Sequence, residues 1–204
     1  MNHVSAESSS SPEESPDVRE LVALFHEDAS ELGSFRRVAV EEVPGVPRRL
    51  LAHHEHMTVS VESHHESAVS VDVLHTWETD DQYAREILLR RVIDDAVVQF
   101  GIVRLRWCHL DSEVRSEIES QRTPLGRILI EHNVLREVEC VALWEVRPGP
   151  ALRDWLGMGS DEVTYGRTAL IHVEGEPAVE LLEIVVPDEV IARNKTHDAS
   201  GGPK

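Results

Sequence analysis

The sequence predicts an α+β protein built on a single antiparallel β-sheet, with helices packed on one side of that sheet. The first observation is that several segments with strand-like apolar patterns are joined by short polar turns, as in β-hairpins. The second is that segments with helical spacing are inserted between groups of strands and do not follow each strand in turn. This order excludes a doubly wound βαβ fold.

The N-terminal part of the chain predicts a tail followed by one helix. Residues 1–16 are acidic, contain four consecutive serines and lack apolar periodicity, so we expect a disordered tail. Asp17 can cap a helix that runs to about Leu32, and Gly33 can end it. Residues 34–52 are expected to be connecting chain. The apolar side of the helix would carry Leu21, Leu24, Phe25 and Ala29.

Apolar alternation replaces the helical pattern in the next part of the chain. Polar residues at 64–67 separate the first two alternating segments, and Asp94 and Asp95 separate two longer apolar runs. A two-residue acidic connection between apolar runs is typical of a hairpin. The four expected strands cover residues 57–63, 68–75, 83–93 and 96–107.

The C-terminal half alternates between helices and strands. A helix is expected over residues 111–121, with Val114 and Ile118 on its inner face. A second helix is expected after Thr123 as N-cap and Pro124 as first helical residue, with an apolar stripe. The later elements are a strand over 134–147, a short helix over 151–156, a hairpin of 164–174 and 178–187, and a polar tail over 190–204.

The length and composition fit one folded domain. The chain has 204 residues, of which 41% are hydrophobic, so it can bury a sizeable core. We expect a disordered acidic tail at 1–16, the domain at 17–189 and a disordered tail at 190–204. No apolar run is long enough to span a membrane, and the polar start resembles neither a signal nor a transit peptide. Two cysteines make no disulfide framework, so a cytoplasmic location is expected.

The charge restricts the possible partners. The 38 acidic residues against 20 basic ones give a net charge of −18. Nucleic acids and anionic membrane surfaces are therefore not expected as partners, because both are bound through basic patches. Any anionic ligand needs a local group of arginines.

The histidines and glycines of the chain do not form a recognisable metal site or catalytic motif. Six histidines lie between residues 53 and 75, but neither H-x-x-E-H nor H-E-x-x-H occurs, and the cysteines are distant. We therefore expect polar loop and strand-end histidines and no metal or other cofactor. The sequence also contains no G-x-S-x-G and no glycine-rich phosphate loop.

Arg85 is the strongest single candidate for binding. It lies in an expected strand with apolar residues on both faces, which predicts burial. A buried arginine needs an anion, either a ligand or an internal partner such as Glu86. Glu180 and Glu183 are three residues apart, so on a regular strand they point to opposite faces, and only one of them can face a pocket.

Two further parts of the sequence carry candidate binding groups, the start of a helix and a strand arginine. The segment Thr123–Gly126 opens a helix whose first N–H groups are free, which suits either a carboxylate site or an ordinary capped helix. Arg167, taken alone, is an ordinary strand charge in the first strand of the last hairpin.

Taken in order, these segments resemble the chorismate pyruvate-lyase family over residues 57–187. The resemblance rests on short motifs at similar spacing, and it is closest at Thr123–Arg127. The other matching segments are Met57–Thr58, Arg85–Leu89, Tyr165–Arg167, Gly175 with Pro177, and Leu182–Glu183 ahead of Pro187. The resemblance implies a chorismate lyase-like fold: a single antiparallel sheet with helices on one side and a small, enclosed ligand cavity.

The resemblance also implies a reaction, the cleavage of chorismate to 4-hydroxybenzoate and pyruvate without metal or cofactor. Arg85 and Glu183 would then be catalytic, Arg85 by binding a substrate carboxylate and Glu183 near the reacting ring carbons. Leu125 would bind substrate through its backbone. Met57, Gly126 and Arg167 would also bind substrate. The family's next motif is displaced here, because Phe100–Gly101–Ile102–Val103 precedes the arginine, so Arg104 is taken as its replacement.

Other readings remain open beside the lyase. One is a stand-alone, non-catalytic protein of the same fold that binds a small aromatic acid, and another is a lyase acting on a related hydroxy acid. A related fold also forms the sensor domain of bacterial transcription regulators, which carry a basic winged helix before it. The first 50 residues here are acidic with one convincing helix, so a DNA-bound regulator is not expected. The expected partner is a small molecule.

Overall fold

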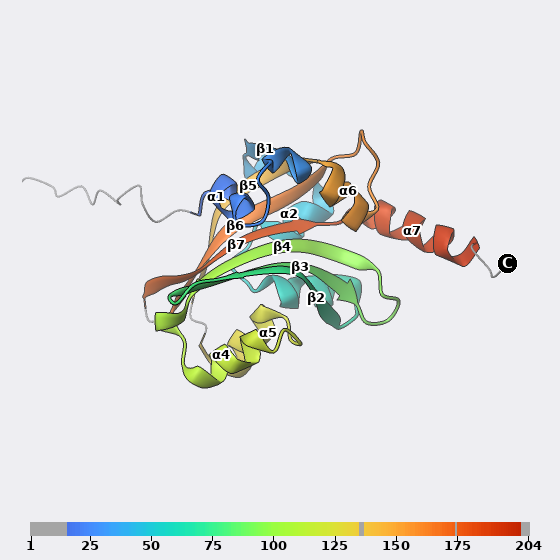
Figure 1. Ribbon diagram of the computed structural model, residues 1–204. Helices are drawn as coiled ribbons and strands as arrows, with labels where there is room; N and C mark the ends of the chain where they lie inside the picture. The colour runs from blue at the N-terminus through green and yellow to red at the C-terminus, as the bar shows by residue number, and fades with distance from the viewer. Residues whose placement is uncertain (1–15, 135–136, 174, 201–204) are drawn as a thin grey trace, which may run out of the picture.

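The computed structural model describes residues 16–134, 137–173 and 175–200, and these form one seven-stranded antiparallel sheet with helices on both faces (Figure 1). The strand order is β1-β5-β6-β7-β4-β3-β2. The strands are β1 (Gly33–Val38), β2 (Val69–Glu78), β3 (Gln82–Arg91), β4 (Val97–Arg106), β5 (Glu137–Pro148), β6 (Thr164–Val173) and β7 (Glu176–Val185). The helices are α1 (Val18–Ala23), α2 (Gly45–Leu51), α3 (Met57–His65), α4 (Ser112–Glu119), α5 (Leu125–Glu131), α6 (Pro150–Leu156) and α7 (Asp188–Ser200).

The α+β class with a single antiparallel sheet is confirmed. Hairpins join β2 to β3, β3 to β4 and β6 to β7. The last two match the prediction, whereas the first replaces the expected pairing of residues 57–63 with 68–75. Two of the connections contain a residue with left-handed backbone, Asp95 at φ 59° and Gly175 at φ 90°, which a tight turn requires. The acidic pair after β3 and the glycine after β6 are therefore turn residues.

Helices cover both faces of the sheet, whereas the sequence analysis expected them on one. On one face, α1 and α6 pack on the central strands, and Trp155 of α6 stacks on Phe100 of β4 with ring centroids 5.6 Å apart. On the other face lie α2, α3 and α5; α5 places Leu125 and Ile128 against the core that contains Tyr83 of β3. In Figure 1, α1 and α6 lie above the sheet, and α4 and α5 lie below it.

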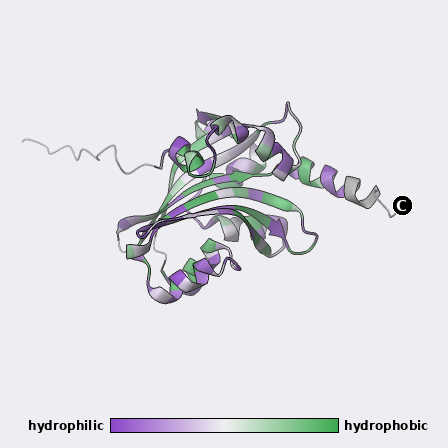
Figure 2. Cartoon of the chain, in the orientation of Figure 1, coloured by the Kyte–Doolittle hydropathy of each residue, from purple (hydrophilic) through white to green (hydrophobic). Residues whose placement is uncertain are grey.

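The central strands supply most of the core. Strands β3, β4, β6 and β7 are buried along most of their length because helices cover both sides of them. Figure 2 shows hydrophobic residues along these strands and a mixture of hydrophobic and hydrophilic residues on the surrounding helices. Continuous apolar runs are the expected pattern for strands that are buried on both faces.

Residues 57–63 form helix α3 and not the predicted strand. Met57, Thr58 and Val61 are buried, which is helical spacing, while Val59 is exposed although the alternation placed it with Met57. The segment is too short for an apolar period of two to be told from one of 3.6. Helix α3 is the element that closes the cavity described below.

The region 24–52 also differs from the prediction. Helix α1 begins after the predicted cap Asp17, which accepts a hydrogen bond from the N–H of Arg19, but the helix ends at Ala23 and not near Leu32. Gly33 begins strand β1, with φ 121° and no room for a Cβ, which would lie 2.1 Å from the carbonyl oxygen of Arg147. The supposed connecting chain contains β1, a 3₁₀ turn and α2. Because β1 pairs only with β5, local pattern alone did not indicate it.

The C-terminal helix α7 occupies most of the predicted polar tail. It runs from Asp188 to Ser200, and its first turns bury Val190 and Ile191, so the expectation of a disordered tail from residue 190 is corrected. Residues 201–204 lie outside the described residues, as do residues 1–15 of the predicted N-terminal tail. Among the described helices, none combines the length and the apolar character that crossing a membrane requires.

An ion pair anchors α7 to the loop after α6 and predicts a measurable pH dependence. Arg193 donates to both carboxylate oxygens of Glu162 at 2.6 and 3.0 Å, and with the N–H of Gly159 it lowers the pKa of Glu162 to about 2. The pKa is depressed in the folded state, so this stabilisation is complete above the unfolded pKa of about 4.3 and is lost as the pH falls toward 2.

We expect the Glu162→Gln variant to lack this pH dependence. Its free energy of unfolding should be lower than that of the wild type at pH 6, and the difference should shrink below pH 4. Urea unfolding at a series of pH values measures the difference. A gap that stays constant from pH 6 to pH 2.5 would show that the pair does not contribute.

Candidate functional site

A small cavity lies between the sheet and the helices α3 and α5. Its volume is about 50 Å³, room for about four water molecules. Strands β3, β4, β6 and β7 form its floor, and the start of α3 and the start of α5 form its roof. Six of the seven sequence-predicted site residues line this cavity: Met57, Arg85, Leu125, Gly126, Arg167 and Glu183.

Arg85 projects from β3 into this cavity and lacks a full set of partners. Its side chain is 1% exposed, and Nη2 donates to the carbonyl oxygen of Thr123 at 3.4 Å. Nε and Nη1 find no hydrogen-bond partner within the described part of the chain. Burial lowers the pKa of the guanidinium below its usual value. An unpaired buried cation is costly, so Arg85 is the best candidate among the described residues for binding an anion.

Glu86 is not the internal partner of Arg85. Its carboxylate is fully buried on the opposite face of the sheet, where it accepts hydrogen bonds from His26 at 2.7 Å and His75 at 2.8 Å. Adjacent residues of a strand point to opposite faces, so Glu86 cannot turn toward the cavity without breaking β3. Of the internal partners that the sequence left open, Glu86 or a sheet neighbour, Glu86 is therefore excluded.

Arg167 and Glu183 form a buried ion pair beside the cavity. Nε of Arg167 donates to Glu183 at 2.7 Å, and both residues are buried. The other donors of Arg167 bind carbonyl oxygens of the loop before α3, at His53 (3.0 Å) and Glu55 (3.2 Å), and more weakly at Leu51 (3.4 Å). Arg167 therefore fastens this loop to the sheet, and most of its donors are already in use.

The walls around Arg85 are mostly apolar, and Gln99 is one of the few polar side chains among them. Gln99 of β4 is 3% exposed, and its Oε1 atom finds no partner among the described residues. The sequence analysis missed Gln99, although a single glutamine inside the apolar run AVVQFGIV is a recognisable signal. The apolar lining comes from Val71, Ile87, Leu89, Val103, Val138, Ile171 and Leu181.

Arg104 does not reach the cavity. It projects from the other face of β4, where it forms ion pairs with Glu180 and Glu20. Glu180 lies opposite Arg104 in the β4–β7 register, so it is Glu180 that faces away from the cavity and Glu183 that faces it. The shift of two residues that suggested Arg104 as a replacement keeps it on this outer face.

The roof depends on close packing between α3 and α5. Helix α5 begins at Leu125, with Pro124 and not Thr123 in the N-cap position. A Cβ on Gly126 would lie 2.7 Å from Oγ1 of Thr58 in α3, which is too close for any contact. Gly126 is therefore needed for the two helices to approach each other.

We expect Gly126→Ala to destabilise the protein by about 1–3 kcal/mol, because α3 and α5 must separate to admit the methyl group. Combining it with Thr58→Ala removes the clashing Oγ1 and should restore part of the loss. Urea unfolding of the single and double variants measures both effects. Equal losses in the two Gly126 variants would contradict the packing argument.

The histidines of the 53–75 region serve different contacts. His53 contributes its carbonyl to Arg167, His54 contacts the carbonyl oxygen of Val138 at 3.0 Å through Nδ1, and His56 lines the cavity. Burial, which outweighs a nearby Glu183, lowers the pKa of His56. His64 and His65 lie at the far end of α3, where burial, His64 and Arg91 lower the pKa of His65 to about 4.

Comparisons with known proteins place the fold and leave the family open. No family model matches the sequence, and no curated protein is significantly similar to it. Among solved structures, the chain is similar to PhnF from Mycobacterium smegmatis, with a TM-score of 0.51 and 9% identity over 64% of this chain. The match covers 63% of that PhnF chain, so the similarity spans less than two thirds of its length.

Isolated regulator domains are matched over more of their length. The effector domain of PhnF matches with a TM-score of 0.52 and 10% identity, over 66% of this chain and 90% of that domain. A ligand-binding domain from Bordetella bronchiseptica, described as part of a GntR-family transcriptional regulator, matches with a TM-score of 0.47 and 12% identity, over 59% and 86%. Such low identities show the fold, which is the chorismate lyase-like fold that the resemblance implied.

These comparisons correct the predicted activity. The similar structures named above are PhnF, its effector domain and a regulator's ligand-binding domain, and none of the three is described as a lyase. The prediction of a chorismate pyruvate-lyase that forms 4-hydroxybenzoate and pyruvate is therefore wrong. Most of the motifs that suggested the enzyme contribute residues to the lining of the cavity.

Proposed function

We propose that this chain is a non-catalytic binding domain for a small aromatic carboxylic acid, and that Arg85 binds the carboxylate. The observation that carries the proposal is the buried Arg85 guanidinium, which leaves Nε and Nη1 without partners in an apolar cavity. Each of these nitrogens shares an edge of the guanidinium with Nη2, whose contact with Thr123 is long at 3.4 Å, so either edge can offer two parallel N–H groups to the two oxygens of a carboxylate.

The remaining lining supports an aromatic ligand. Ile87 and Leu181 are among the apolar side chains that would contact a ring. Arg85 of β3 lies opposite Val103 of β4, and Gln99 is four residues before Val103 on that strand. That is about 13 Å between backbones. A carboxylate at one end and a hydroxyl donor near Oε1 of Gln99 at the other would satisfy both unpaired groups.

The size of the cavity implies that binding moves the roof. A volume of about 50 Å³ is well below the 300 Å³ or more of typical ligand pockets. The floor is a sheet with fixed register, so the ligand must displace α3 and α5. Met57 of α3 lines the cavity, and its flexible side chain can rearrange when a ligand enters. The likeness to the PhnF effector domain supports a sensing role, in which the ligand shifts the position of these helices.

The proposal is tested by calorimetric titration of the full chain with 4-hydroxybenzoate and benzoate. We expect binding by the wild type and a loss of about 100-fold or more in Arg85→Gln, because two charge-assisted hydrogen bonds disappear. Arg104→Gln is the matched control, since it removes an arginine from the opposite face of the same sheet, and it should bind like the wild type. Equal affinities in the two variants, or no binding by the wild type, would overturn the proposal.

Incubation with chorismate checks the correction of the predicted activity independently. We expect the protein to leave chorismate intact over hours, as followed by chromatography. Equimolar formation of 4-hydroxybenzoate and pyruvate, absent in Arg85→Gln, would contradict a non-catalytic role.

A further inference from the structure

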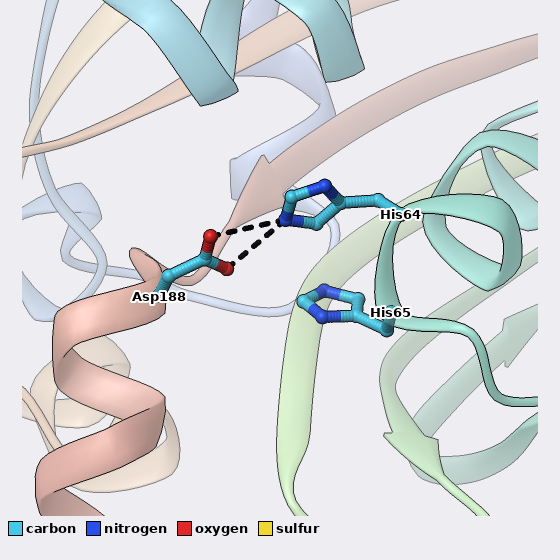
Figure 3. A group of neighbouring side chains, drawn as sticks. All are labelled: His64, His65 and Asp188. Carbon is cyan, nitrogen blue, oxygen red and sulfur yellow. Dashed lines mark hydrogen bonds and ion pairs between the residues drawn. The ribbon is translucent and has the colours of Figure 1, made fainter.

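Two adjacent histidines at the end of α3 and an aspartate at the start of α7 face one another outside the cavity (Figure 3). Nε2 of His64 lies 3.1 Å from each carboxylate oxygen of Asp188. The rings of His64 and His65 have centroids 4.6 Å apart. One ligand atom from each of the three side chains lies within 4.8 Å of the other two.

The three groups have the chemistry and spacing of a metal site. Imidazole nitrogens and a carboxylate oxygen are preferred ligands of Zn²⁺ and of similar divalent transition metals. In a tetrahedral zinc site, bonds of about 2.1 Å place the ligand atoms roughly 3.4 Å apart. The separation between His64 and Asp188 is already close to this value, and a small rotation of His65 brings in the third ligand.

The surroundings of the three side chains permit a cation. The side chains of His64 and Asp188 are 22% and 48% exposed, so a metal ion and a fourth ligand from water can reach them. Arg91, a positive charge whose field acts on His65, is paired with Asp94 at 2.9 Å. The net charge of −18 favours cations near the surface in general.

We propose that His64, His65 and Asp188 bind a divalent transition metal ion, with zinc as the best match to the donor set. The sequence analysis expected no metal because it searched for ligand spacing within the histidine-rich region. The third ligand comes from the other end of the chain, so no local motif could reveal it. The bound ion would join the end of α3 to the start of α7.

The position of α3 gives this site a structural consequence. Helix α3 begins with Met57 at the cavity and ends with the two histidines, so a metal would fix the end of the helix that is remote from the cavity. A ligand that binds only the folded state stabilises it, and zinc should therefore raise the melting temperature. This inference does not depend on the proposed binding of an acid.

The test is calorimetric titration of the chelator-treated full chain with Zn²⁺, repeated with Co²⁺ to record the visible absorption of a tetrahedral site. We expect one site, with affinity at least about tenfold weaker in His65→Ala and in Asp188→Asn. His172→Ala is the matched control, because His172 also pairs with a carboxylate, Glu139 at 3.2 Å, and should bind zinc like the wild type.

Two results would overturn the proposal. One is the absence of zinc binding by the wild type. The other is unchanged affinity in both His65→Ala and Asp188→Asn, which would place the metal elsewhere, for instance at the histidines before α3. Circular dichroism shows whether each variant is folded, and all three substituted side chains lie near the surface. A rise in melting temperature with zinc, absent in Asp188→Asn, gives a second readout.

Discussion

Arg85→Met is expected to raise the free energy of unfolding of the ligand-free protein by about 1–3 kcal/mol. Arg85 is 1% exposed, and two of its nitrogens have no partner in the described part of the chain, so the folded state contains a desolvated cation that the unfolded state returns to water. Methionine has a similar length and is apolar, and replacing buried charges by apolar side chains is often stabilising by such amounts. Urea unfolding followed by circular dichroism measures the change, and the melting temperature should rise by several degrees.

A matched substitution on the other face separates this effect from a general gain on removing arginine. Arg104→Met removes an arginine that has two acidic partners, so its free energy of unfolding should stay the same or fall by up to about 1 kcal/mol. With saturating aromatic acid, the wild type should have a higher free energy of unfolding than Arg85→Met, because only the wild type gains stability from binding. A destabilised Arg85→Met would mean that Arg85 has a partner in solution.

Arg167→Met is expected to have the opposite effect and to cost about 3–5 kcal/mol. Arg167 is fully buried, binds Glu183 at 2.7 Å and holds the carbonyl oxygens of the loop before α3. Its removal leaves the buried carboxylate without its partner and the loop without its attachment, and breaking one half of a buried pair typically costs this much. The two buried arginines of the cavity therefore affect stability with opposite sign.

Two further variants identify the cause of the loss. Adding Glu183→Gln to Arg167→Met removes the uncompensated charge and should recover part of the stability, while the loop contacts stay lost. Arg36→Met is an exposed control, since Arg36 pairs with two carboxylates, Glu42 and Glu145, but its removal should cost no more than about 1 kcal/mol. Equal losses in Arg167→Met and Arg36→Met would contradict the importance of burial.

The parts of the fold that the sequence predicted well are those specified by local pattern. The hairpin of β3 and β4 and that of β6 and β7 follow from apolar runs separated by few polar residues, and burial on both faces makes these runs long. The burial of Arg85 followed from the same pattern. The alternation of side chains along a strand predicted that Glu180 and Glu183 lie on opposite faces of the sheet. Only the structure shows that Glu183 is the one that faces the cavity.

The errors have a common physical origin in contacts between distant segments. Strand β1 exists because β5 offers a free edge, and the backbone of Arg147 leaves room only for a glycine at Gly33. Residues 57–63 form a helix because Met57, Thr58 and Val61 are buried together over the cavity. Arg104 was misplaced because a shift of two residues preserves a face without saying which face it is.

The strand order divides the sheet into two locally connected halves that meet along a seam between β4 and β7. Strands β2 to β4 form one half and β5 to β7 most of the other, while the seam pairs Phe100 with Ile184, far apart in the chain. Pairings of this kind form late and slowly during folding, because a long loop must close before they form. Arg85 belongs to the first half, and Arg167 and Glu183 to the second. The cavity therefore comes into existence only when the seam closes, and any ligand that fills it will slow the opening of that seam.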